Sequence, residues 1–245
     1  MVNRFTGMIY PAVALLATMT ATGRTEGQMD PEAWLRETEE AYAEATNYTA
    51  RFHKQQRVAG TLLHKETILI KFRRPFSLYM RWIAAPNEGS ELLYVQGWNE
   101  NLARVHKGGF FRFITRNLDP TNPRLMSSNL RPLTDMGIDF FLKTVAVNVR
   151  KAVKAGELSV HERGEEPVYG RKTHIFEVVF PKDRTKGYDA YRMIINRDIE
   201  SKILIRIQLY DWDDHPFELY GYEDLKLNAG LTDADFDPEN PDYHF

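Results

Sequence analysis

The side chains in this chain that could do chemistry are seven histidines and a run of alternating carboxylates near the C-terminal end. No two histidines lie at the spacing of a metal-ligand pair, and the chain has no Gly-x-Ser-x-Gly elbow, phosphate-binding loop, dinucleotide glycine fingerprint or His-Glu-x-x-His pair. There is no cysteine, so thiolate metal sites, disulfides and lipid-modified cysteines are excluded. The sequence therefore favours binding over catalysis, and we predict neither enzymatic activity nor a cofactor.

The carboxylate run is the best metal candidate. Asp233, Asp235, Asp237 and Glu239 alternate as at the start of a calcium-binding loop. The glycine that such a loop needs at its sixth position is missing, and His244 stands where a bidentate glutamate would close it. We therefore predict no metal.

Charge is distributed unevenly along the chain. Residues 51–154 carry 18 Lys and Arg against 7 Asp and Glu, whereas residues 155–245 carry 11 against 20. The basic part could attract nucleic acid, anionic headgroups or an acidic partner. We favour mutual neutralisation of the two parts across one folded sheet, and we predict no nucleic-acid partner.

The first residues have the pattern of a secretory signal. Arg4 supplies a positive start, residues 8–20 form an apolar run broken only by Pro11, and Ala21-Thr22-Gly23 offers small residues for cleavage. The run is shorter than the roughly 20 residues that a bilayer span needs. We predict a signal peptide over residues 1–23, a single domain over residues 24–245, and a periplasmic protein without a transmembrane segment in its mature form.

The elements that follow begin with one helix and a series of strands. Asp30-Pro31 is a typical helix start, and apolar residues at helical spacing follow it for about four turns. From Tyr48 the apolar period changes to two, and short loops separate successive strands up to residue 115. Such loops predict an antiparallel meander, with its last strand over residues 110–115.

Residues 68–83 form the most apolar hairpin of this meander. Branched and aromatic residues run up to Arg74-Pro75 and continue beyond it, which predicts two strands. Alternation places Leu78, Met80 and Trp82 on one face, with Tyr79 and Arg81 on the other. One face of the hairpin must therefore be covered, by protein alone or partly by a ligand.

A helix and a second meander complete the chain. Thr134 is the predicted cap of a helix that runs to about Ala155 and carries an apolar stripe, with Gly156 as its stop. Strands are predicted over residues 158–163, 173–180, 191–196, 202–210 and 217–227. The cleanest alternation, Ile203 to Leu209, predicts one inward face.

Three segments carry a resemblance to a known family. They are Tyr-Thr-Ala-Arg-Phe-His-Lys-Gln-Gln after the first helix, Ile-Leu-Ile-Lys-Phe-Arg-Arg-Pro-Phe-Ser-Leu-Tyr-Met-Arg-Trp, and Glu-Leu-Leu-Tyr-Val-Gln-Gly-Trp-Asn. Together with the order of elements, they resemble the periplasmic lipoprotein carrier LolA and its outer-membrane receptor LolB. The closing Leu-Lys-Leu-Asn-Ala-Gly-Leu-Thr-Asp-Ala-Asp-Phe-Asp-Pro resembles the tail of an uncharacterised bacterial family related to that group.

The resemblance implies an α+β fold: a curved antiparallel sheet of about eleven strands, an unclosed β-barrel, with helices over its concave face and an apolar cavity for acyl chains. The residues expected to face that cavity are Leu78, Met80, Trp82, Phe111, Phe113, Phe140, Phe141, Val145, Ile205 and Ile207. A basic rim of Arg73, Arg74 and Arg81 would contact an anionic headgroup.

The leading hypothesis is therefore a non-enzymatic carrier of a lipid or acylated protein. A longer chain, a more basic helical insertion and the lack of an anchoring cysteine depart from the Lol pattern, which weakens a role in lipoprotein sorting. The alternative is an envelope protein-interaction module that uses the outer sheet face or the edge strands. A hydrolase with an unrecognised site is the third reading.

Overall fold

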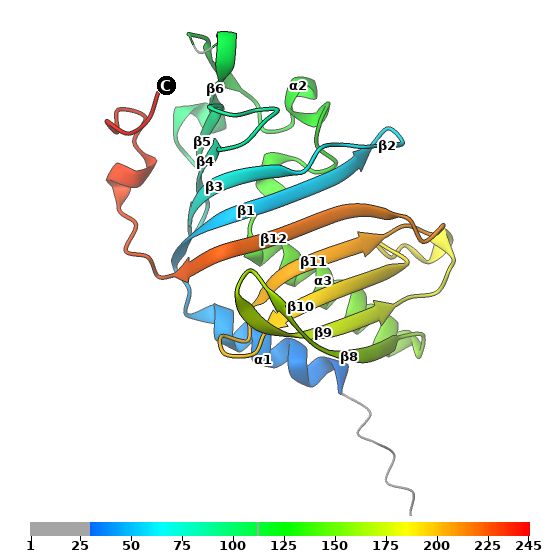
Figure 1. Cartoon of the computed structure of the whole chain (residues 1–245). Coiled ribbons are helices and arrows are strands. Elements are labelled where there is room, and N and C mark those ends of the chain that lie inside the picture. Colours follow the sequence, from blue (N-terminus) through cyan, green and yellow to red (C-terminus); the bar gives the residue numbers. More distant parts are fainter. Residues whose placement is uncertain (1–29, 112) are drawn as a thin grey trace, which may run out of the picture.

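The computed structural model describes residues 30–111 and 113–245, so the predicted signal peptide lies outside the described residues (Figure 1). Three α-helices are α1 (Pro31–Ala43), α2 (Pro123–Met126) and α3 (Ile138–Ala155). The strands are β1 (Asn47–Val58), β2 (Thr61–Leu62), β3 (Glu66–Arg73), β4 (Ser77–Trp82), β5 (Glu91–Val95), β6 (Ala103–His106), β7 (Thr115–Leu118), β8 (Ser159–Val168), β9 (Arg171–Val179), β10 (Arg192–Asp198), β11 (Leu204–Tyr210) and β12 (Pro216–Leu227).

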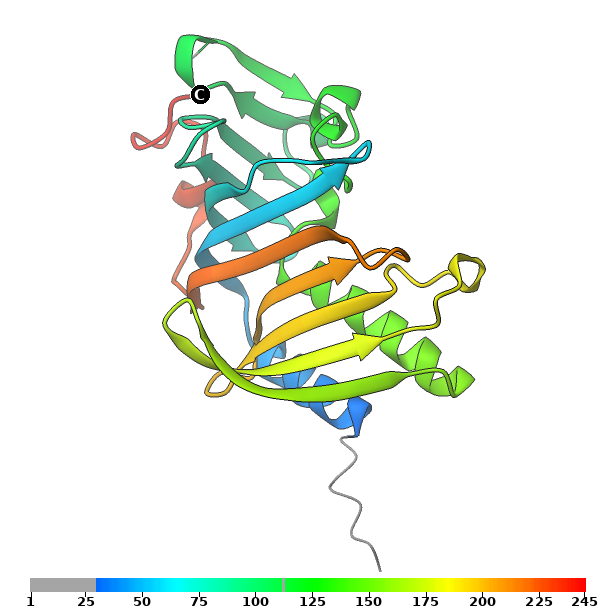
Figure 2. The same ribbon diagram turned by 45° about the vertical axis from the view of Figure 1, so that its right-hand side comes forward.

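All of these strands belong to one antiparallel sheet. Its order is β7-β6-β5-β4-β3-β1-β12-β11-β10-β9-β8, and the short β2 pairs only with β1. Two meanders therefore meet along β1 and β12, where Phe52 pairs with Tyr222 and Lys54 with Tyr220. The sheet is curved but not closed, which confirms the predicted unclosed barrel (Figures 1 and 2).

The topology explains why a helix covers the sheet. β7 and β8 follow each other in the sequence but form the two opposite edges, so residues 119–158 must cross the full width of the sheet. This connection contains α2 and α3, and α3 lies behind the strands in Figure 1. An apolar stripe on α3 makes the crossing stable, because Val145 and Val149 are fully buried on its inner side.

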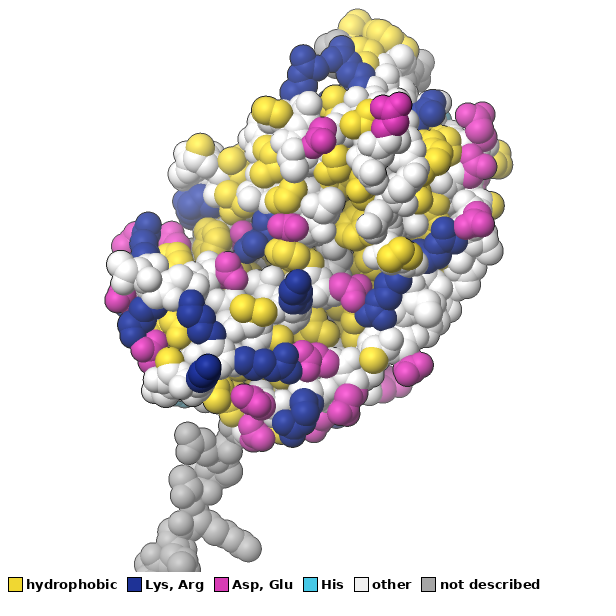
Figure 3. All heavy atoms as spheres, turned by 180° about the vertical axis from the view of Figure 1, so that it is seen from behind, with side chains coloured by type: hydrophobic (Ala, Val, Ile, Leu, Met, Phe, Trp, Pro, Cys, Tyr) yellow, Lys and Arg dark blue, Asp and Glu magenta, His cyan; other side chains and the backbone are white. Residues whose placement is uncertain are grey.

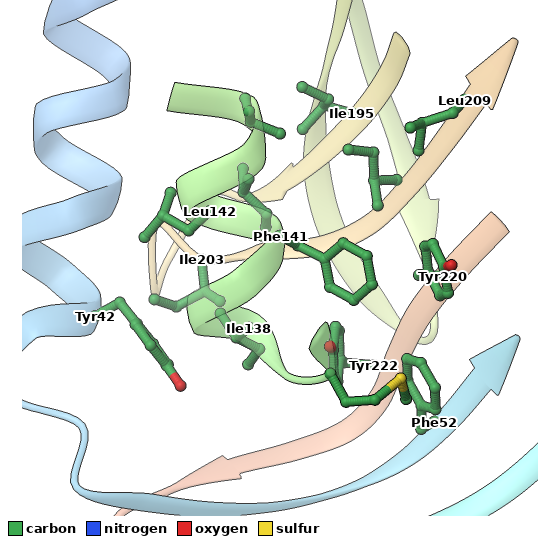
Figure 4. Close-up of a cluster of buried hydrophobic side chains, with 14 of the residues drawn as sticks. Tyr42, Phe52, Ile138, Phe141, Leu142, Ile195, Ile203, Leu209, Tyr220 and Tyr222 are labelled. Atoms are coloured by element: carbon green, nitrogen blue, oxygen red, sulfur yellow. The ribbon is translucent and has the colours of Figure 1, made fainter. Parts of the chain in front are cut away.

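The main core fills the space between α3 and the concave face. Phe141 points from α3 toward Tyr220 of β12, with ring centroids 4.2 Å apart (Figure 4). Phe52 stacks on Tyr220 at 6.0 Å, and Tyr48 stacks on Phe72 at 5.1 Å. α1 closes one end, where Trp34 stacks on Phe176 at 5.1 Å. Aromatic side chains of this size fill most of the concave space with protein.

The predicted cap of α3 is wrong by three residues. Leu133–Asp135 forms a 3-10 turn, and the helix begins at Ile138 after Gly137. Gly137 has φ 101°, a backbone conformation that residues other than glycine rarely adopt, so the chain turns here before it enters the helix. The predicted cap Thr134 therefore lies in the turn ahead of α3, while the predicted stop at Gly156 is confirmed.

The strand predicted over residues 110–115 is also incorrect. Gly109–Phe111 forms a 3-10 turn instead, and β7 starts only at Thr115. Gly108 packs tightly against backbone, since a Cβ there would lie 2.1 Å from the carbonyl oxygen of Glu88. This close approach and the turn that follows it displace the aromatic residues from the sheet. Phe113 is 76% exposed.

A β-bulge interrupts the alternation of β11. Asn196 of β10 pairs with Arg206 and the next residue, Arg197, pairs with Leu204, so the ladder skips Ile205. Leu204 and Ile207 belong to the main core cluster, whereas Ile205 is buried outside it. The single inward face predicted from Ile203 to Leu209 is therefore broken at Ile205.

The C-terminal segment after β12 covers part of the convex face, a contact that the sequence did not predict. Phe236 and Tyr243 form a second, smaller core cluster with Tyr79 of β4 and Leu93 of β5. The segment runs past β3, β4 and β5 on the side away from α3 (Figure 1). The β3–β4 hairpin thus has protein on both of its faces.

Ion pairs join the basic and the acidic parts of the chain. Lys71 contacts Asp235 at 2.7 Å, Arg131 contacts Glu218 at 3.2 Å, and Arg51 contacts Glu223 at 3.4 Å. The predicted neutralisation across one sheet is thereby confirmed.

Candidate functional site

The concave face changes character along the strands. The inward positions of β1 read Tyr48, Ala50 and Phe52 near the start of α3, then Lys54 and Gln56 toward the far end. The last two are only 5% and 3% exposed. The two strands that flank β1 follow the same gradient, from Tyr222 to Glu218 on β12 and from Phe72 to Glu66 on β3. A buried polar region therefore adjoins the aromatic core on one continuous surface.

One ion pair in this region is built around Glu66 of β3. Its carboxylate lies 2.6 Å from Nζ of Lys54 and accepts hydrogen bonds from Nε1 of Trp82 at 2.8 Å and Nδ2 of Asn87 at 2.7 Å. Burial raises the pKa of Glu66, but Lys54 and these donors outweigh it and hold that pKa below its ordinary value. Glu66 is therefore charged at neutral pH. Lys54 also donates to Oδ1 of Asn129, in the segment that crosses above it.

A second pair lies beside the first. Nε of Arg131 is 3.2 Å from Oε2 of Glu218, whose side chain is 3% exposed. Burial raises the pKa of Glu218, and Arg131 opposes this rise. Nε2 of Gln56 donates to the Tyr220 hydroxyl at 2.6 Å, and a hydrogen bond between Tyr220 and Glu218 connects the pair to the aromatic core.

A cavity of about 120 Å³ lies between this polar region and the chain around α2. Its apolar wall comes from the sheet and from the crossing segment: Met80, Trp82, Leu92, Val105, Pro120, Leu125, Met126, Leu133 and Met136. Its polar lining is Lys54, Glu66, Asn87, Ser90, Glu91, Lys107, Arg124, Ser128, Asn129 and Arg131. The cavity is thus amphipathic, with both apolar and charged groups in its lining.

An open groove of about 890 Å³ lies between the β3–β4 turn and the first half of α3. It is lined by Phe72, Arg74, Pro75, Phe76, Thr134, Asp135, Met136, Asp139, Phe140, Lys143, Thr144, Val147 and Asp189. Seen from behind, the molecule exposes apolar side chains over its upper half, while charged side chains dominate the lower half (Figure 3). Val147 of α3 is 57% exposed at the wall of this groove.

The groove and the cavity share Met136 as a common wall. Beside it, the guanidinium of Arg131, which lines the cavity, lies 5.2 Å from the ring of Phe140, which lines the groove. Methionine is unbranched and adapts its shape readily. The cavity and the groove are adjacent at Met136.

The structure places the ten predicted cavity residues in different environments. Met80 and Trp82 line the cavity and Phe140 lines the groove. Core residues that line neither space are Leu78, Phe141, Val145 and Ile207. Ile205 lies at the bulge, outside the main core cluster. Phe113 is corrected to an exposed loop residue, and the side chain of Phe111 lies outside the described residues.

The predicted arginine rim is not assembled. Arg73 pairs with Asp233 at 2.8 Å and lies over the Phe236 ring at 4.8 Å, and Arg81 lies 3.9 Å from Glu91. Arg73 thus lies against the C-terminal segment. Arg74 alone lines the groove, where it pairs with Asp139 at 2.6 Å.

Sequence reasoning missed the polar end of the concave face. The signal was present, because Lys54 and Gln56 continue the inward alternation that begins at Tyr48. Charged and amide residues at inward positions of a strand need buried partners.

In residues 30–111 and 113–245, no group of three or more His, Asp or Glu could hold a metal ion. In the same residues, no helix is long and apolar enough to cross a membrane.

Comparison with known families identifies the chain as a member of the family described as "Protein of unknown function (DUF1571)", whose model matches residues 45–245. No curated protein matches it in sequence.

Solved structures resemble it in fold. The lipoprotein LppX of Mycobacterium tuberculosis is 14% identical, with 85% of this chain and 100% of that chain covered and a TM-score of 0.50. MucB is 14% identical over 86% of this chain and 63% of that chain, with a TM-score of 0.49. A LolA superfamily protein from Nitrosomonas europaea is 9% identical over 84% and 96% of the two chains, with a TM-score of 0.34. The likeness to LppX supports the predicted fold, an unclosed antiparallel sheet covered by helices.

Proposed function

We propose that this protein is a periplasmic, non-enzymatic carrier of a lipid or an acylated protein, and that the groove beside α3 holds the acyl chain. The observation that carries the proposal is the groove itself, an open space of about 890 Å³ in which Phe72, Pro75, Phe76, Met136, Phe140 and Val147 form an apolar surface among polar and charged side chains. Pockets of about 300–1,000 Å³ with mostly apolar walls are typical of sites for small apolar ligands.

The position of the groove also supports the proposal. It lies at the edge of the cover that α3 forms over the concave face, so a chain could enter from solvent without unfolding the core. Pro75 and Phe76 form one side, and Phe140 and Val147 the other. When a ligand binds, it covers the exposed valine in this wall and removes its apolar surface from contact with water, which favours binding.

The test is the affinity for a fluorescent long-chain acyl probe, measured by titration of the purified mature protein. Val147→Lys places a charge in the groove wall and is expected to weaken binding by about tenfold or more. Val153→Lys is the matched control, because Val153 is exposed on the same helix but does not line the groove. Equal affinity of both variants and the wild type would overturn the proposal.

The protein-interaction alternative has less support. The convex face over β4 and β5 is already covered by the C-terminal segment. The edge strand β8 carries Glu162, Glu165 and Glu166, and its register with β9 breaks between Glu162 and Glu165. Charges and bulges of this kind protect an edge from pairing with another chain.

A further inference from the structure

We propose that the cavity under α2 binds an anionic group, a phosphate or a carboxylate, which is the headgroup of the amphiphile whose acyl chain lies in the groove. This inference rests on the proposed function, and it places the headgroup away from Arg73, Arg74 and Arg81.

The charges around the cavity do not cancel. Lys54 is balanced by Glu66, and Arg131 by Glu218. The carboxylate of Glu91, which also lines the cavity, is bound by His244, whose Nδ1 and backbone N lie 2.7 and 3.1 Å from it.

Two cations remain. Lys107, which follows β6, and Arg124 of α2 both line the cavity and are exposed to solvent. In the described part of the chain, neither side chain has an ion-pair partner. The site therefore has an excess of positive charge that an anion would neutralise.

Buried donors add to this preference. The ammonium of Lys54 has three N–H groups and gives two of them to Glu66 and Asn129, so one is left for a ligand. Lys54 is 5% exposed, and a charge–charge hydrogen bond at such a site is strengthened by the lack of competing water.

The two volumes divide the ligand between them. The cavity of about 120 Å³ holds several water molecules and so fits a compact polar group, but it is too small for a long chain. The groove has the space that the cavity lacks, and Met136 borders both. A headgroup in the cavity and a chain in the groove would therefore belong to one molecule that passes Met136.

Calorimetric titration with soluble lysolipids of one chain length tests the proposal. Lysophosphatidylglycerol is anionic and lysophosphatidylcholine is zwitterionic, and inorganic phosphate is titrated as a free anion. The wild type should bind the anionic lysolipid about tenfold more tightly than the zwitterionic one. Lys107→Gln with Arg124→Gln should abolish that preference. Arg36→Gln with Lys154→Gln, which removes two exposed cations of α1 and α3 that do not line the cavity, should retain it.

The possible outcomes distinguish failure of the anion site from failure of the acyl-chain carrier. Equal affinity for both lysolipids, unchanged in the Lys107 and Arg124 variant, would overturn the anion site and leave the acyl-chain carrier standing. Phosphate that binds as tightly as the anionic lysolipid, with no gain from the chain, would retain the anion site and overturn the carrier. No binding of any of the three probes would overturn both.

Discussion

The ring of Tyr243 stacks on the ring of Tyr79, with centroids 3.9 Å apart and planes at 10°. Tyr79 belongs to β4 and points away from α3, so this contact fixes the C-terminal segment on the convex face. The Tyr243 hydroxyl also donates to the carbonyl oxygen of Asp235 at 2.7 Å, and Lys71 holds the Asp235 carboxylate. The segment is therefore an integral part of the folded domain.

Tyr243→Ala should lower the free energy of unfolding by about 1–2 kcal/mol, because it removes a stacked pair and exposes Tyr79 and Leu93 to water. Urea denaturation followed by circular dichroism measures the change. Phe113→Ala is the control: its side chain is 76% exposed, and the expected change is within about 0.5 kcal/mol. If the two variants were equally stable, the segment would not contribute to the fold.

Lys54 and Glu66 should behave as a coupled buried pair. Lys54→Met leaves a charged Glu66 without its cation, with an expected loss of about 3–5 kcal/mol of unfolding free energy. The double variant Lys54→Met with Glu66→Leu removes both charges and should be more stable than Lys54→Met alone. Chemical denaturation of the wild type, Lys54→Met, Glu66→Leu and the double variant gives the coupling energy, and additive losses would contradict the pair.

Stability should depend on pH through two histidines. Burial lowers the pKa of His53, although Glu223 at 2.8 Å opposes this effect. Burial also lowers the pKa of His106, and His244 beside it acts in the same direction. A histidine with a lowered pKa in the folded state binds fewer protons there than in the unfolded chain. The free energy of unfolding should therefore fall as the pH drops below about 6.5, the ordinary value.

His53→Gln with His106→Gln should flatten this dependence between pH 7.5 and 5.5, a range chosen to bracket the ordinary histidine pKa. The matched control is His64→Gln with His161→Gln, since both of these histidines are exposed. Thermal or urea unfolding at several pH values measures the slope. If the control pair changed the slope as much as the test pair did, His53 and His106 would not be the source of the pH dependence.

Local pattern was sufficient where the structure repeats regularly. Alternation placed Leu78 and Met80 on the face opposite Tyr79, and the core clusters confirm it. The short loops between successive strands in both meanders correctly predicted that the sheet is antiparallel. Period-two patterns are reliable here because one face of each strand is buried along its length.

Sequence pattern failed where backbone geometry or distant contacts decide the outcome. The bulge at Ile205 and the 3-10 turn at 109–111 each shift a register that the pattern assumes to be continuous. The C-terminal segment has no periodicity, because its aromatic residues fit pockets that strands far away in the sequence create. For the same reason, sequence pattern did not predict the acidic partners of Arg73 and Arg74, which lie at positions 233 and 139.

The central pairing of β1 with β12 has a consequence for the order of folding. Each meander is built from neighbouring strands and can form early from local contacts, but Phe52 and Tyr222 meet only after most of the chain has been made. The closure of this long loop carries an entropic cost before its contacts form. We therefore expect the joining of the two halves to be the late, rate-limiting step, and α3 to be seated on a complete concave surface only when that step is finished.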